Sequence, residues 1–148
     1  MNKEPFNIVL ADDDEGDRLL FAEALKDLKI KANINTVKDG VELMEYLSHE
    51  DTPPPFLLFL DLNMPCKNGL DCLKEIRSSE KLREVPVAIY STSSTESDIE
   101  KTFLSGANIY IKKPNDFSSL KEVLHKVVMA AHTYREPPFN IANFIFRG

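Results

Sequence analysis

Short apolar runs alternate along this chain with longer segments in which apolar residues recur every three or four positions. Five runs have the length and the β-branched or aromatic content of strands: residues 6–11, 32–37, 56–60, 85–90 and 109–111. Each run is followed by a segment with the apolar spacing of a helix. Strands that alternate with helices predict a parallel β-sheet, and right-handed crossovers favour a doubly wound α/β domain with helices on both faces.

Polar residues at the ends of these segments indicate where the helices begin. Asp14 and Asp116 are expected to cap the first and last helices, and Ser93 or Ser94 to cap the fourth. Apolar residues at every position of 56–60 predict a central strand that is covered on both faces. The first helix is expected to bury one apolar face, formed by Leu20, Phe21, Ala24, Leu25 and Leu28.

Composition narrows the class of protein further. The chain has 148 residues, 43% of them hydrophobic and 28% charged, which is typical of one globular domain. A net charge of −6 argues against direct DNA binding, because such binding depends on Lys and Arg. No apolar run approaches the ~20 residues that span a bilayer. The first residues do not resemble a signal peptide, and two cysteines are too few for a disulfide framework. We therefore expect a cytoplasmic protein without membrane insertion.

Polar and charged residues follow four of the five predicted strands. They are Asp12 and Asp13 after the first, Asp61 after the third, Ser91 and Thr92 after the fourth, and Lys113 after the fifth. In an open parallel sheet the functional crevice lies beyond the carboxyl ends of the strands. We therefore expect these side chains to meet at one edge of the sheet.

The chemistry of this cluster points to phosphoryl transfer. Clustered carboxylates repel one another unless a cation lies between them, and oxygen ligands in an incomplete cage suit Mg²⁺. Asp61 follows five apolar residues, where an idle charge at the edge of the core is costly. An Asp beside a metal, an ammonium and a hydroxyl is suited to accept a phosphoryl group. The residues alone therefore predict a Mg²⁺-dependent phosphoacceptor site.

Four motifs, in a fixed order, carry a family resemblance. The chain resembles bacterial two-component receiver domains of the single-domain, chemotaxis-regulator type in residues 8–14, 61–65 with Gly69, 91–93 and 113–114. This resemblance implies a flavodoxin-like receiver fold with strand order 2-1-3-4-5. The proline-rich loop before the third strand and the Thr-Ser-Ser run after Ser91 also resemble small regulators that are paired with phytochrome-type kinases.

The resemblance implies a phosphorylation site and a set of metal ligands. Asp61 would receive the phosphoryl group. Mg²⁺ would be bound directly by Asp13, Asp61 and the main-chain carbonyl of Asn63, and through water by Asp12. Asn63 and Ser93 occupy two variable positions that tune phosphate lifetime in the family, and neither is a carboxylate.

The resemblance also implies a switch. Ser91 would be the hydroxyl that moves onto the phosphate, Lys113 the ion partner of the phosphate, and Tyr110 the aromatic residue whose rotamer follows Ser91. Ser91 stands where the family more often has Thr. Thr92 stands where the family often has Ala, which places a bulkier side chain beside the phosphate.

The expected function is that of a stand-alone response regulator. A sensor histidine kinase or a phosphotransfer protein would phosphorylate Asp61, and a change of surface would signal to a downstream protein target. The domain would not be an enzyme for a separate substrate, although it would assist its own phosphorylation and dephosphorylation. We expect the receiver in residues 1–133 and a C-terminal extension in 134–148, without a separate output domain. The sequence leaves open the kinase, the stimulus, the target, the phosphoryl lifetime and a homodimer.

Other functions fit the residues less well. A receiver-like interaction module that works without phosphorylation remains the alternative. A hydrolase of the haloacid-dehalogenase type needs a second acid two residues after its nucleophile, and this chain has Asn63 there. A phosphate-cradling NTPase or a dinucleotide-binding protein needs a glycine-rich loop after the first strand, where this chain has the acidic residues 12–15.

The C-terminal residues stand outside the alternating pattern. Pro137 and Pro138 are followed by five large apolar residues within 139–146. Such a group is rarely left in water. We expect it either to fold back over the domain's own helices or to pack against a second subunit or a partner.

Overall fold

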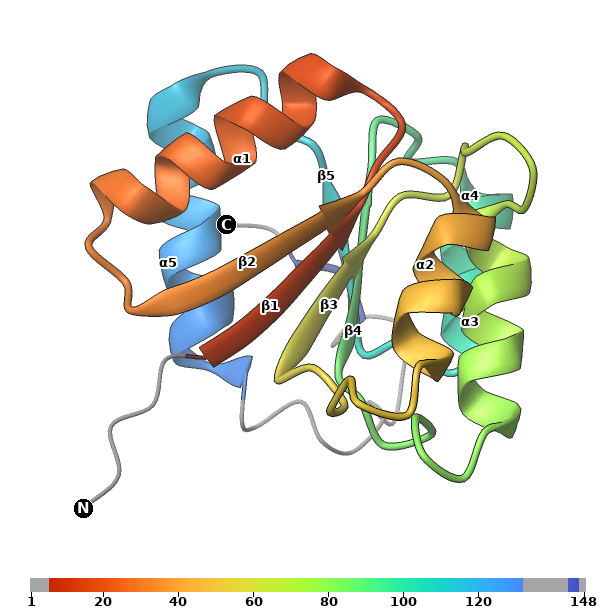
Figure 1. The fold of residues 1–148 in the computed structure, drawn as a ribbon. Helices are drawn as coiled ribbons and strands as arrows, with labels where there is room; N and C mark the ends of the chain where they lie inside the picture. Colours follow the sequence, from red (N-terminus) through yellow and green to blue (C-terminus); the bar gives the residue numbers. More distant parts are fainter. Residues whose placement is uncertain (1–5, 132–143, 147–148) are drawn as a thin grey trace.

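Five parallel strands form one sheet in the order β2-β1-β3-β4-β5 (Figure 1). The structure is a computed structural model that describes residues 6–131 and 144–146. The strands are β1 (Phe6–Ala11), β2 (Ala32–Val37), β3 (Leu57–Leu60), β4 (Val87–Ser91) and β5 (Ile109–Lys112). The predicted strand order and the predicted α/β class are confirmed.

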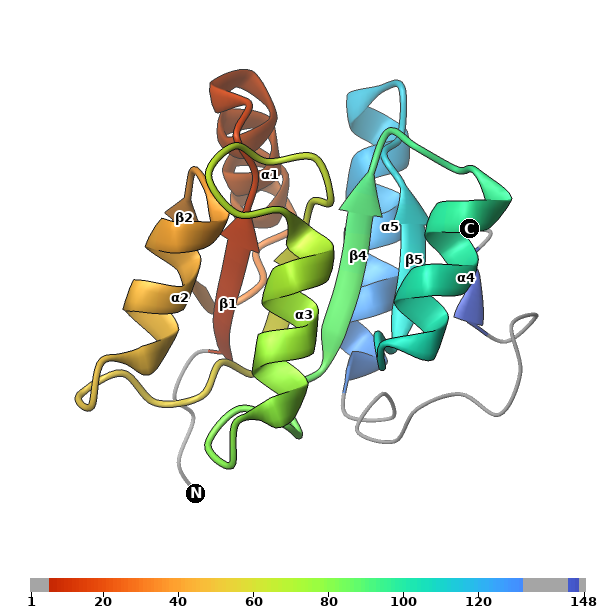
Figure 2. The same ribbon diagram turned by 90° about the vertical axis from the view of Figure 1, so that its right-hand side faces the viewer.

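Five helices cover the two faces of the sheet. They are α1 (Glu15–Asp27), α2 (Gly40–Ser48), α3 (Gly69–Ser78), α4 (Glu96–Leu104) and α5 (Phe117–Met129). Figure 2 shows α2, α3 and α4 in front of the sheet and α1 and α5 behind it, and each layer has its own apolar cluster. The longest described helices have 13 residues, and none of the described helices is long and apolar enough to cross a membrane.

Side-chain caps fix where the helices start. Asp14 and Asp116 cap α1 and α5 as predicted, because their carboxylates accept the backbone N–H groups of Asp17 and Ser119. The predicted serine cap of α4 is wrong. Thr95 caps this helix, whereas the Ser93 hydroxyl donates to the Asp98 carboxylate.

The apolar face of α1 is narrower than its sequence predicts. Phe21, Ala24 and Leu25 are buried, and Leu28 packs at the margin of the same cluster. Leu20, however, is 50% exposed. Helical residues one position apart point about 100° away from each other, so Leu20 lies to the side of the face that buries Phe21, where it lines a pocket with Lys113 and Leu120.

Arg77, near the end of α3, joins the segments that lead into β4 and β5. Its guanidinium donates hydrogen bonds of 2.8–2.9 Å to the carbonyls of Gly106, Arg83 and Val85 and to the side-chain oxygen of Asn108. The same Asn108 oxygen accepts the N–H of Val87 at 2.8 Å. This network fixes where β4 and β5 begin, and therefore where their carboxyl ends lie.

Part of the C-terminal extension is described. Residues 144–146 lie against the outer edge of β5, where the Phe146 N–H donates to the Tyr110 carbonyl at 2.9 Å. Residues 134–143, 147 and 148, which also belong to the expected extension, lie outside the described residues.

We expect Arg77→Met to lower the free energy of unfolding by about 2–3 kcal/mol, because it removes the guanidinium donors from the carbonyls of Gly106 and Val85 in partly buried hydrogen bonds. Urea denaturation measures this change. Arg83→Met is the matched control, since the Arg83 side chain is exposed, and it should cost less than about 0.5 kcal/mol. Equal stability of the two variants would mean that the Arg77 hydrogen bonds are dispensable.

Candidate functional site

Three carboxylates meet at the carboxyl ends of β1 and β3. Asp12 follows β1 and is 0% exposed, and Asp61 follows β3 and is 5% exposed. Asp13 is exposed beside them. One carboxylate oxygen of each residue lies within 4.8 Å of the others. The structure therefore brings together the three acids that the sequence predicts as a cluster.

Backbone pairing holds two of these acids in place. The N–H of Asp12 donates to Val37, and the N–H of Asp61 donates to Ala11, both at 3.0 Å. The strand ladder thus continues one residue past the end of each strand. The sheet therefore fixes the backbone positions of Asp12 and Asp61, from which their side chains extend.

Gly69 allows α3 to begin directly against Asp61. A Cβ atom at residue 69 would lie 2.1 Å from the carbonyl oxygen of Asp61. The Gly69 N–H also donates to the Leu62 carbonyl at 3.0 Å. Any side chain at residue 69 would push the loop after β3 away. Glycine is therefore required here, because the backbone of α3 lies so close to the carbonyl of Asp61.

Lys113 supplies the positive charge of the site. Its backbone N–H donates to the Ser91 carbonyl at 2.8 Å, which places the residue beside β4. Its Nζ lies 2.8 Å from Asp12 Oδ2, 2.9 Å from Asp17 Oδ2 and 3.2 Å from Asp61 Oδ2. The predicted ammonium therefore contacts both buried acids.

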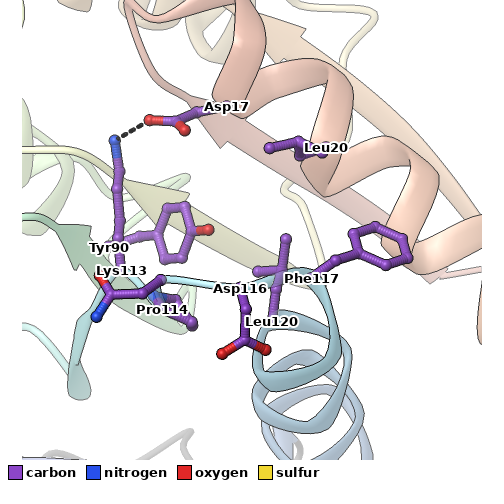
Figure 3. A pocket seen from close by; sticks show the side chains of 9 residues that line it. Asp17, Leu20, Tyr90, Lys113, Pro114, Asp116, Phe117 and Leu120 are labelled. Carbon is purple, nitrogen blue, oxygen red and sulfur yellow. Dashed lines mark hydrogen bonds and ion pairs between the residues drawn. The ribbon is translucent and has the colours of Figure 1, made fainter.

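Asp17 is a site residue that the sequence reasoning missed. Figure 3 shows Lys113 reaching toward Asp17 on α1. An acid in the first turn of a helix is explained by the helix dipole alone, so its sequence position gives no reason to look further. The sequence offers one indication that Asp17 belongs to the site: it comes four residues after Asp13, about one helical turn later, so its side chain can point toward the same strand ends.

Burial and neighbouring charges shift the pKa values of the two central groups. Burial is the largest effect on Asp61 and raises the pKa of this carboxyl; Lys113 acts to lower it, and Asp12 raises it further. For Lys113, burial acts to lower the pKa, but the contacts with Asp12 and Asp17 outweigh it, and the pKa is raised. The ammonium therefore stays protonated, whereas the ionised form of Asp61 is held at a cost.

The donor set fits a hard divalent cation. Asp12 Oδ2 is buried and, within residues 6–131 and 144–146, has no hydrogen bond of normal geometry, only the ion pair with Lys113. Asp13 reaches the cluster from the solvent side. Carboxylate oxygens with one side open to water are the ligands that Mg²⁺ prefers. Asn63 is exposed in the adjoining loop, and its N–H donates to Asp61 Oδ1 at 3.3 Å.

A chain of hydrogen bonds runs from the end of β4 to β5. Ser91, the last residue of β4, is 0% exposed, and its Oγ accepts the Ser93 N–H at 3.2 Å. The Tyr110 hydroxyl donates to the Ser93 carbonyl at 2.7 Å, and the Tyr110 residue is 1% exposed. Thr92 is exposed on the loop between Ser91 and Ser93. The predicted switch residues are thus connected through Ser93.

Comparison with known proteins identifies the family. The response regulator receiver domain model matches residues 8–125. The chain belongs to this family. The predicted resemblance is confirmed, and with it the assignment to the receiver domains of two-component systems.

Receiver relatives match this chain over most of their length. Response regulator Rcp1 of Synechocystis is 31% identical over 127 residues, which cover 83% of this chain and 86% of Rcp1. Chemotaxis protein CheY-3 of Vibrio cholerae is 32% identical over 127 residues, covering 86% of this chain and 94% of CheY-3.

Solved receiver structures agree with the fold. The phosphorylated cyanobacterial phytochrome response regulator RcpA has 33% sequence identity and a TM-score of 0.80, over 87% of this chain and 95% of RcpA. The Mn(2+)-bound form of Rcp1 has 31% identity and a TM-score of 0.75, over 83% of this chain and 91% of Rcp1.

In metal-free protein, we expect Asp61→Asn to raise the melting temperature at pH 7. The folded-state pKa of Asp61 is raised, so its ionised form destabilises the fold above that pKa. The gain should shrink as the pH falls through the folded-state pKa and disappear below the ordinary Asp pKa of 3.8, where the carboxyl is protonated in both states. Thermal melts followed by circular dichroism, with a chelator present, measure the difference.

Asp51→Asn is the control for this prediction, because Asp51 is an exposed acid in a turn. It should leave the melting temperature unchanged at each pH. A variant Asp61→Asn that melts below wild type at pH 7 would show that the Asp61–Lys113 pair outweighs the cost of burial.

Proposed function

We propose that this receiver accepts a phosphoryl group on Asp61 in a Mg²⁺-dependent reaction and signals to a protein partner through a change of surface. The observation that carries the proposal is the surroundings of Asp61. Its buried carboxylate directly follows the central strand β3, lies 3.2 Å from the Lys113 ammonium and shares a cluster with two further acids.

The metal would be held by the acids of the cluster. Asp13, Asp61 and the main-chain carbonyl of Asn63 are the proposed direct ligands, with Asp12 acting through water. The Mn(2+)-bound form of Rcp1 supports a divalent metal in this family. When bound, Mg²⁺ neutralises charge on the phosphoryl oxygens.

In the proposed transfer, an Asp61 carboxylate oxygen bonds to phosphorus while phosphorus separates from a histidine nitrogen of the donor protein. The leaving imidazole keeps the electron pair of the broken bond and takes a proton from solvent. Lys113 stabilises the transferred oxygens, because its ammonium is already within 3.2 Å of Asp61 Oδ2. The domain thereby assists its own phosphorylation, and the same groups would assist hydrolysis by water.

The switch would begin at Ser91. A phosphoryl group on Asp61 offers oxygens to the Ser91 hydroxyl, and a Ser91 that turns toward them changes its contact with the Ser93 N–H. The exposed Thr92 would lie beside the phosphate on the same loop. Because the Ser93 carbonyl also holds the Tyr110 hydroxyl, the change would reach β5. Phosphorylation would then favour one arrangement only through these differing contacts.

The proposed partners are a sensor histidine kinase or a phosphotransfer protein upstream and a protein target downstream. Phytochrome-type kinases are the first class to test, since RcpA is named as a phytochrome response regulator. We place the receiver in residues 1–133 and an extension in 134–148, in a cytoplasmic protein. The acidic balance of the chain gives no basis for direct DNA binding. The proposed partners also include a second copy of this chain, as a homodimer.

Wild-type protein should gain one phosphoryl group from acetyl phosphate in the presence of Mg²⁺, and Asp61→Asn should gain none. Intact-mass spectrometry follows the reaction. Asp13→Ala should slow it, because a hard-cation site depends on its number of carboxylates. Asp51→Asn should react like wild type. Phosphorylation of Asp61→Asn at the wild-type rate would exclude Asp61 as the acceptor, and an unreactive wild type would favour the phosphorylation-independent interaction module.

Ser91→Ala should still be phosphorylated but should not pass the change on to Tyr110. In ¹⁵N–¹H spectra, phosphorylation should then shift the amides of the site but leave those of Tyr110 and α4 near their starting positions. Ser94→Ala, an exposed change in the same loop, should behave like wild type. Wild-type shifts at Tyr110 in phosphorylated Ser91→Ala would contradict the proposed switch.

A further inference from the structure

β5 is an edge strand. The side of β5 that faces away from β4 is covered by residues 144–146, which we call the covering segment. An edge strand presents unpaired backbone groups that can bind another strand. Ile145 forms a parallel bridge with Tyr110, and the Phe146 N–H donates to the Tyr110 carbonyl at 2.9 Å. Figure 2 shows the covering segment, in dark blue, next to α4. The covering segment therefore donates a backbone hydrogen bond to the outer side of β5 at Tyr110.

The side chains of the covering segment straddle the edge of the sheet. Phe144 is 0% exposed and belongs to the apolar cluster beneath α2, α3 and α4. Its ring lies 5.4 Å from that of Phe103 on α4 and 6.0 Å from that of Tyr110, measured between centroids. Phe146 packs against the opposite cluster, beneath α1 and α5. The covering segment therefore packs aromatic side chains against both faces of the sheet, as a strand paired with this edge would.

The covering segment also meets the hydrogen-bonded path to the site. Phe144 packs on the ring of Tyr110, the Tyr110 hydroxyl bonds to the Ser93 carbonyl, and the Ser93 N–H bonds to Ser91. With the segment docked, Tyr110 is 1% exposed. The ring cannot turn toward solvent along this edge while Phe144 occupies the adjoining space.

We propose that residues 144–146 dock on the edge of β5 of their own chain, where they lock the Tyr110 ring in its buried position and so order the loop after β4. The segment must leave before Tyr110 turns outward or before a partner's strand pairs with this edge. The contacts with Tyr110 are made within one chain. Residues 132–143 connect Ala131 to Phe144, and twelve residues can span up to ~40 Å when extended, so the connection is long enough to allow docking within the chain. This proposal does not depend on phosphorylation of Asp61.

Hydrogen exchange and ¹⁹F NMR on the full chain test the proposal. In wild type, the Phe146 amide should be protected, and Phe144→Ala should speed its exchange by roughly tenfold or more. Protein labelled with fluorotyrosine, with the Tyr110 signal assigned through Tyr110→Phe, reports ring exposure through the difference between H₂O and D₂O. Phe144→Ala should increase this difference for Tyr110 and shift the Ser93 amide.

Leu104→Ala is the matched control, because Leu104 is a large apolar residue of α4 that is 74% exposed. It should change neither readout. Amides of Leu58 and Phe59 in β3 report whether Phe144→Ala remains folded. If it does not, Phe144→Leu keeps an apolar side chain without the ring contacts and should give an intermediate Tyr110 exposure.

Three results would overturn the proposal. The first is a wild-type Phe146 amide that exchanges at the unprotected rate. The second is a Tyr110 signal that is the same in wild type and in the folded Phe144 variants. The third is protection of Phe146 that rises with protein concentration, because the occupant would then come from a second copy of the chain.

Discussion

The arrangement of the site depends on one ammonium among buried carboxylates. Lys113 contacts Asp12, Asp17 and Asp61, and through them it joins β5 to β1, β3 and α1. An unpaired buried charge is costly, so Asp12, Asp61 and Lys113 each need an oppositely charged neighbour to stay ionised in this position. The ends of three strands are therefore held together by charge as well as by the backbone ladder.

The same interaction leaves the site short of positive charge. Asp12, Asp17 and Asp61 contact the Lys113 ammonium, and Asp13 lies beside Asp12 and Asp61. The Arg18 guanidinium donates to the main-chain carbonyl of Asp12, so these four acids exceed the two nearby cations, and burial already raises the pKa of Asp61. A divalent cation would relieve this excess, because the exposed Asp13 and the carboxylate of Asp61 lie within reach of one ion. A phosphoryl group adds further negative charge, so the proposed acceptor reaction and the proposed metal depend on each other.

Site residues that directly follow a strand could be predicted from the sequence, whereas those whose position depends on helix packing could not. Asp61 and Lys113 could be found because each directly follows an apolar run and because parallel strands end at one edge. Asp17 could not, since a first-turn acid already has a local explanation. The prediction of the α4 cap failed for a related reason: four consecutive hydroxyl residues precede Thr95, and the choice of cap depends on the contact between Ser93 and Asp98.

The short strand β5 links the chemistry of the site to the outer edge of the sheet. Lys113, directly after β5, contacts the acids, and Tyr110, within it, contacts both Ser93 and Phe144. Tyr110 lies only three residues before Lys113, and β5 is paired with β4 along its four residues. The number of apolar residues in the C-terminal extension predicted that they would be covered, but not where. β5 is one of the two edge strands of the sheet, and at its edge Phe144 and Phe146 reach the apolar clusters on the two faces.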